Sequence, residues 1–154
     1  MASNATPVYG KQYIRFAETC YIPCPVVIHQ FSVVSVDPTG TGTGDLANSV
    51  GPTDPPTAML FDGSTAWGVL QQEFNDCSCD YATDRLRLGT VATSGLLLIN
   101  ADADNLQVQG DALLVDAEGR SSSAGAAVLV DSTTPTVRQQ VLVGGVSMVL
   151  VSWN

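Results

Sequence analysis

The chain has 154 residues, with 15 acidic and 6 basic side chains and a net charge of −9. A field of this sign repels phosphate backbones and anionic lipid headgroups, which argues against nucleic acid and membrane surfaces as partners. Charged residues make up 14% of the chain, against about 25% in an average globular domain, so much of the surface should be uncharged.

The N-terminal stretch differs from the rest of the chain. Residues 1–11 are small and polar and have no periodicity that could bury a face, so we expect an extended arm ahead of one β-rich domain at 12–154. The arm lacks the cationic and apolar regions of a signal peptide. The longest apolar run, 141–153, is too short for a membrane-spanning helix. These features predict synthesis in a cytoplasm and no membrane segment.

Short β-branched and aliphatic runs recur along the chain, separated by Gly, Asp, Asn, Pro and Ser. This pattern is typical of strands punctuated by turns, and it predicts an all-β body. Between the second and third runs, residues 37–56 are rich in Gly, Thr and Pro and predict a long loop. The predicted strands are 13–16, 25–36, 66–71, 85–93, 95–100, 106–108, 112–115, 126–130, 136–143 and 146–153.

The last two predicted strands are separated by Gly144 and Gly145 alone. A glycine pair supplies the positive φ angles that a two-residue hairpin turn requires. The sequence therefore predicts a C-terminal β-hairpin.

Two local patterns resemble ligand-binding loops without meeting their requirements. The Gly-Thr-Gly-Thr-Gly run at 40–44 does not fit a dinucleotide-binding loop, whose Gly-x-Gly-x-x-Gly spacing requires a glycine where the chain has Asp45. The helix that should follow such a loop is not predicted either. The acidic run at 100–105 has Leu106 and Gln107 where a calcium-binding loop of the EF-hand type needs an oxygen ligand and a glycine. We interpret both runs as loops or turns.

His29 is the single histidine, so any catalytic triad must include it. No Gly-x-Ser-x-Gly nucleophile motif accompanies it, which favours a structural or surface histidine. The sequence thus predicts no enzyme, no catalytic residues and no cofactor.

The four cysteines form two close pairs, Cys20 with Cys24 and Cys77 with Cys79. They could form disulfides, remain as free buried thiols, or together hold zinc. A disulfide between the first pair and the second is favoured over the other arrangements, because a ring closed within Cys-x-Cys is strained.

From residue 58 to residue 151 the order of features resembles the capsid decoration (cement) proteins of tailed bacteriophages. Three pieces carry the resemblance: DGSTAWGVLQ at 62–71, RLRLGTVATSGLLLI at 85–99, and GDALLVDAEG at 110–119 followed by Arg120. The resemblance implies a small β-barrel-like or sandwich-like body, often trimeric, that binds the outer surface of the head. It also implies the major capsid protein as partner and the virion as location.

The arm suits such a role. Val8 and Tyr9 are apolar anchors that could lie in a neighbour's groove, and with Tyr13 they are the predicted capsid-contact residues. We expect the arm to contribute to docking and not to the stability of the body. The alternative is another β-rich assembly subunit of a phage or bacterium, such as a tail, fibre or appendage protein.

Overall fold

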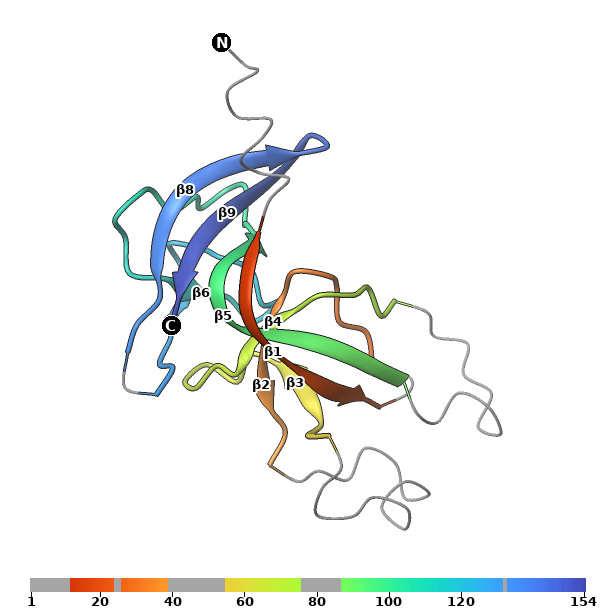
Figure 1. Cartoon of the computed structure of the whole chain (residues 1–154). Coiled ribbons are helices and arrows are strands. Elements are labelled where there is room, and N and C mark those ends of the chain that lie inside the picture. The colour runs from red at the N-terminus through yellow and green to blue at the C-terminus, as the bar shows by residue number, and fades with distance from the viewer. Residues whose placement is uncertain (1–11, 24–25, 39–54, 76–86, 132) are drawn as a thin grey trace.

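The computed structural model describes residues 12–23, 26–38, 55–75, 87–131 and 133–154 (Figure 1). The arm at 1–11 and most of the loop at 37–56 lie outside these residues. The described residues form strands and no helix, which confirms the all-β prediction for this part of the chain. The strands are β1 (Tyr13–Ile22), β2 (Val33–Val36), β3 (Ala58–Leu60), β4 (Gly68–Leu70), β5 (Arg87–Asn100), β6 (Leu114–Val115), β7 (Ala126–Ala127), β8 (Thr136–Val143) and β9 (Val146–Trp153).

One antiparallel sheet contains seven of the strands. Its order is β3-β2-β4-β5-β9-β8, and β1 joins it by pairing with β5. The short strands β6 and β7 pair separately. The long strand β5 belongs to both halves of the sheet, because it pairs with β1 and β4 in its first part and with β9 from Gly95 onward.

Strand β5 bends at Gly95, where φ is +132°. A Cβ atom at this position would clash with the carbonyl oxygen of Tyr13 in β1. Glycine therefore allows β1 to approach while β5 continues through the bend. The two strands predicted at 85–93 and 95–100 are in fact this one strand, because the glycine that suggested a break is a bend.

The half of the sheet that contains β1, β2, β3 and β4 curls until its ends meet. Tyr21 in β1 forms a bridge with Thr57, and its N–H donates to the Pro56 carbonyl oxygen at 2.9 Å. This contact is a single bridge and not a full ladder. Inside the curl lies a buried cluster made of Cys20, Ile22, Ile28, Val34, Ala58, Leu70 and Val91.

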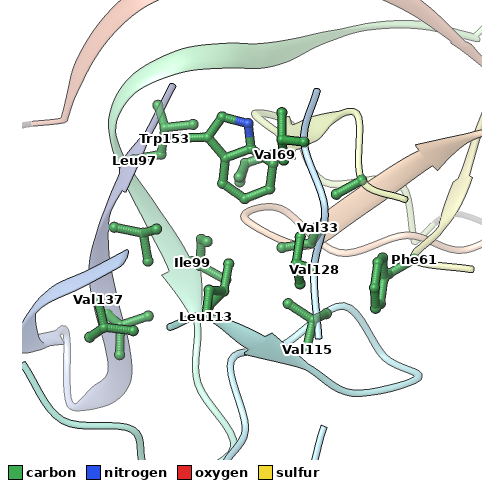
Figure 2. Packing of buried hydrophobic residues seen from close by; sticks show 14 of the residues in the cluster. Val33, Phe61, Val69, Leu97, Ile99, Leu113, Val115, Val128, Val137 and Trp153 are labelled. Atoms are coloured by element: carbon green, nitrogen blue, oxygen red, sulfur yellow. The ribbon is translucent and has the colours of Figure 1, made fainter. Parts of the chain in front are cut away.

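The larger core lies against the other half of the sheet (Figure 2). Leu97 and Ile99 of β5 and Trp153 of β9 face Leu113 and Val128 from the segment around β6 and β7. All five side chains are fully buried. Burying each of the aliphatic ones stabilises the fold by about 1.5–3 kcal/mol, so this cluster fixes how the β6–β7 segment sits on the sheet.

The C-terminal hairpin has the predicted bounds. β8 and β9 match the predicted strands 136–143 and 146–153, and they are joined by Gly144 and Gly145 with φ of +57° and +81°. Positive φ at both central residues is the geometry of the tight hairpin turn. The hairpin prediction is confirmed.

Other strand boundaries were wrong for identifiable reasons. β1 extends six residues beyond the predicted 13–16, because its pairing with β5 continues to Ile22. In the predicted strand 25–36 only Val33–Val36 is a strand, since Phe31 adopts a positive φ of 66° in a turn. Strand β3 was not predicted at all. The predicted strands 66–71, 112–115 and 126–130 shorten to Gly68–Leu70, Leu114–Val115 and Ala126–Ala127.

The strand predicted at 106–108 does not form. The side chain of Gln107 is buried and bonds to the backbone of neighbouring segments, donating to Ala112 O and accepting from Leu114 N–H. The Val108 N–H donates to a carboxylate oxygen of Asp111. Side-chain hydrogen bonds thus satisfy this segment in place of a strand ladder.

Candidate contact surface on strand β1

Strand β1 places large apolar side chains in solvent. Tyr13 and Phe16 are each 65% exposed and Ile14 is 41% exposed. The strand is exposed on both faces from Tyr13 to Thr19 and becomes buried only at Cys20. These three side chains are called the β1 surface below. Apolar residues gathered in this way mark interaction sites more often than scattered single residues do.

The β1 surface lies at an edge of the sheet. One side of β1 pairs with β5, while among the described residues no strand or bridge pairs with its other side between Tyr13 and Cys20. The pairing with β5 shifts register between Ile14 and Phe16 and again between Phe16 and Ala17. Such bulges interrupt a regular edge and redirect side chains, so the side chains and not a long free ladder offer the contact.

Polar groups flank the β1 surface on one side. Trp67 Nε1 donates a hydrogen bond to Glu18 Oε2 at 2.9 Å, which connects the Glu18 side chain to the residue directly before β4. Arg15 is exposed between the apolar residues. One acid and one base make this strand locally neutral within a chain of net charge −9. Because the strand carries no net charge, it does not electrostatically repel an approaching protein surface, whereas the whole chain, with its net negative charge, repels anions.

The predicted contact residues divide between described and undescribed parts. Tyr13 is on the β1 surface, and Val8 and Tyr9 lie outside the described residues. The sequence analysis did not single out Ile14 and Phe16, which it treated only as part of the predicted strand 13–16. The signal was present: the run Tyr-Ile-Arg-Phe does not alternate apolar and polar residues as a half-buried strand does.

His29 lies on the surface, as the sequence favoured. Its Nδ1 is 2.5 Å from Glu73 Oε2, and the Gln30 N–H donates to Glu73 Oε1 at 2.9 Å. Partial burial raises the pKa of Glu73, but the hydrogen bonds from His29 and Gln30 outweigh it and leave the pKa below its ordinary value. The hydrogen-bonded pair of His29 and Glu73 connects the chain before β2 to the chain after β4. This geometry is that of a structural contact.

The acidic run at 100–105 is a turn, as predicted. Asp102 accepts hydrogen bonds from the Asp104 N–H and the Asn105 side-chain amide, and its other neighbour is the Ser122 hydroxyl at 3.1 Å. The bond from Asn105, then that from Asp104, hold the pKa of Asp102 below its ordinary value. Within the described ranges, no three His, Cys, Asp or Glu side chains gather as they would around a metal ion.

Cys20 is a free thiol in the structure. It is fully buried inside the curl, and burial raises its pKa to about 11. A thiol with this pKa is protonated and unreactive at neutral pH. Cys24, Cys77 and Cys79 lie outside the described residues, so the disulfide between the two cysteine pairs stays a prediction.

A shallow hollow of about 320 Å³ lies between Phe61, Asp62 and Asp116. Its two carboxylates bond to their own turns: Asp62 accepts from the Ser64 and Thr65 N–H groups, and Asp116 accepts from Arg120. Through these bonds the two carboxylates stabilise their own turns. The presence of both acidic residues is therefore accounted for without a bound ligand.

The described part of the chain contains no helix long and apolar enough to cross a membrane. Comparison of the chain with protein-family models, with curated proteins and with solved structures finds no match.

Proposed function

We propose that this chain is a structural, non-enzymatic protein that decorates the outer surface of a tailed-phage capsid and stabilises the head by bridging capsomers. The observation that supports the proposal best is the β1 surface, where Tyr13, Ile14 and Phe16 are exposed at a sheet edge. The order of sequence features, which resembles that of decoration proteins, supports the major capsid protein as the partner of this surface.

The proposed contact uses side chains more than backbone. Aromatic residues contribute strongly to protein interfaces because they remove much apolar area from water at a low entropic cost. Two bulges interrupt the free edge of β1, so a long strand added by the partner would meet an irregular ladder. A groove on the capsid that receives Tyr13 and Phe16 fits this arrangement. The β1 surface follows directly after the arm, so Val8 and Tyr9 can extend the same contact.

The test is binding to purified undecorated heads of the phage that encodes the chain. Phe16→Asp should reduce the bound copies after washing, with affinity at least about tenfold weaker, or about 1.4 kcal/mol. Leu142→Asp is the matched control, because Leu142 is 59% exposed at the tip of the β8–β9 hairpin. It should bind as the parent chain does. Both variants should melt near the parent temperature, which separates attachment from folding.

Equal retention of the two variants would remove the β1 surface from the contact. Recovery of the chain with purified tails or fibres, and not with heads, would favour the alternative of another β-rich assembly subunit. Mass spectrometry of purified virions, with stoichiometry measured against the major capsid protein, distinguishes these outcomes.

A further inference from the structure

Four arginines lie in the described part of the chain, and two of them bond within it. Arg87 donates to the Pro23 carbonyl oxygen at 2.8 Å and lies over the ring of Phe74. Arg120 donates to Asp116 Oδ2 at 2.9 Å. Both of these guanidinium groups therefore stabilise contacts of their own chain.

The other two, Arg15 and Arg138, are exposed, and their guanidinium groups have no hydrogen-bond or ion-pair partner among the described residues. Each is the extra residue of a β-bulge. Arg15 is skipped in the register of β1 with β5, and Arg138 is skipped in the register of β8 with β9. A bulge leaves its extra residue unpaired and redirects its side chain. The same local geometry thus places both arginines in solvent.

The bulge at Arg15 depends on Gly95 of β5. A Cβ atom at Gly95 would clash with the Tyr13 carbonyl oxygen and would lie 3.0 Å from the Arg15 backbone nitrogen. Because glycine has no side chain, the irregular part of β1 can lie directly against the bend of β5. The position of Arg15 is therefore fixed by the pairing of two strands.

The surroundings of the two bulge arginines differ. Arg15 lies within the β1 surface, where Tyr13 and Phe16 are each 65% exposed. Arg138 directly follows Val137, which is fully buried in the larger core. Its strand β8 lies beyond β9, on the other side of β5 from β1 (Figure 1). Of the four described arginines, Arg15 alone combines a free guanidinium group with the β1 surface.

The acidic residue of the same strand does not neutralise Arg15. The Glu18 carboxylate accepts the hydrogen bond from Trp67 Nε1 at 2.9 Å, and no ion pair joins these two described residues, Glu18 and Arg15. The cation stays available although the strand carries no net charge. In a chain with 15 acidic and 6 basic residues, a free arginine among exposed apolar side chains is a local exception.

We propose that Arg15 binds a carboxylate on the partner of the β1 surface, at the border of the groove that receives Tyr13 and Phe16. A guanidinium group presents its N–H donors in a planar fork that matches the two oxygens of a carboxylate. Arginine and aromatic residues are enriched together at protein interfaces, and the strongest contacts are surrounded by residues that exclude water. Burial of the two rings beside the ion pair would strengthen it, because the local dielectric falls.

The inference rests on the proposed function and adds to it that the capsid groove carries an acidic residue. The anion is assigned to a protein because a protein groove can also receive the apolar side chains. A phosphate backbone is disfavoured, since the net charge of −9 repels its dense negative charge.

The test is binding to purified undecorated heads at low and at high salt. Arg15→Glu should weaken binding at least about tenfold, because it places two like charges together. Arg138→Glu is the matched control: it makes the same change of charge at the other bulge and should bind as the parent does. Both variants should melt near the parent temperature, since both side chains are exposed.

Two milder substitutions separate charge from shape. Arg15→Gln should weaken binding less than Arg15→Glu and should reduce its salt dependence, because it removes the attraction without adding repulsion. Arg15→Lys keeps the charge but loses the planar fork, so its affinity should fall between those of the parent and Arg15→Gln.

A carbodiimide cross-link identifies the partner group, because it joins an amine to an adjacent carboxylate as an amide. The single lysine of the chain, Lys11, is first replaced by Lys11→Arg. In that background the amine introduced by Arg15→Lys should couple to an Asp or Glu of the major capsid protein, as peptide mass spectrometry detects. The amine introduced by Arg138→Lys should not.

Retention of the parent on heads, with equal retention of Arg15→Glu and Arg138→Glu, would overturn this inference and leave the proposed function standing. Failure of the parent to bind heads at either salt concentration would instead overturn the proposed function, and the named partner with it. Coupling of the introduced amine at position 15 to a second copy of the chain, in the absence of heads, would also count against the inference, because the carboxylate would then belong to the chain itself.

Discussion

Strands β1 and β9 are both apolar and both pair antiparallel with β5, yet their environments differ. β9 buries Met148 to Val151 without interruption, with Val149 and Val151 in the larger core and Met148 and Leu150 in a separate buried cluster on the opposite face. β1 exposes every residue from Tyr13 to Thr19. The difference shows that apolar composition does not decide burial, which depends on whether another layer lies over the strand.

The two strands therefore have different roles. β9 stabilises the body, because its side chains are removed from water on both faces. The exposed part of β1 adds little to stability, since its side chains lose little contact with water on folding, and it is free for contact with another molecule. Substitutions in the two strands should therefore separate stability from attachment.

The largest effect is expected at the end of β9. Trp153 is fully buried in the larger core, between Leu97 and Val69 (Figure 2). Trp153→Ala should lower the free energy of unfolding by about 3–5 kcal/mol, because it removes a large buried side chain and leaves a cavity. Denaturant unfolding measures this loss. A loss below about 1 kcal/mol would show that β9 is not the strand that holds the core.

Trp153→Phe is the informative companion. The indole Nε1 is buried and has no hydrogen-bond partner among the described residues. Phenylalanine keeps an aromatic ring in the core and removes this unsatisfied donor, whose burial costs free energy. We expect Trp153→Phe to lose less than half of what Trp153→Ala loses in the same measurement.

A smaller loss is expected at the turn that leads into β9. Gly145 has a φ of +81°, and a Cβ atom there would meet no neighbouring atom within 4 Å. Gly145→Val should still lower the free energy of unfolding by more than about 1 kcal/mol, because a β-branched residue strains at positive φ. Gly145→Asn is the control, since asparagine tolerates this region, and it should lose clearly less. Equal melting of all three proteins would refute the role of the turn geometry.

Acid should weaken the turn that follows β5. The hydrogen bonds from Asn105 and Asp104 keep the pKa of Asp102 below its ordinary value in the folded protein. The ionised carboxylate therefore stabilises the fold above its ordinary pKa, and this contribution is lost as pH falls through the lower folded value. Melting temperature should fall with pH below about 4, and Asp102→Asn should flatten that dependence. An identical pH profile for parent and variant would contradict this assignment.

Regions formed by interactions between residues close in sequence could be predicted from the sequence, and regions formed by long-range interactions could not. The hairpin of β8 and β9 was predicted to the residue, because Gly144 and Gly145 mark the turn and both strands alternate in character. The continuity of β5 through Gly95 was not, since it depends on the close approach of Tyr13 from a segment 82 positions earlier. Turn chemistry is local, whereas a bend that admits a neighbouring strand is not.

The candidate site divides in the same way. Tyr13 was predicted as a contact residue from its position after the arm. The run Tyr-Ile-Arg-Phe does not alternate as a half-buried strand does, but this pattern alone does not identify Phe16 as the side chain that stays in solvent. Its exposure follows from the place of β1 at the sheet edge, which only the long-range pairing with β5 determines. The buried state of the Cys20 thiol likewise depends on the curl that β3 completes.

The smallest effect on stability is expected at Phe16. This residue tests the difference between β1 and β9 most directly. Phe16→Ser removes an aromatic ring that is 65% exposed, so the free energy of unfolding should change by no more than about 0.5 kcal/mol. A buried phenylalanine truncated in this way would lose several times as much, as Trp153→Ala should. A loss above about 2 kcal/mol in denaturant unfolding would mean that another layer covers β1 in the free protein. An unchanged free energy of unfolding for Phe16→Ser, combined with loss of head binding by Phe16→Asp, would instead assign this ring to contact between molecules. The side chain would then contribute almost no binding or folding free energy until a partner buries it.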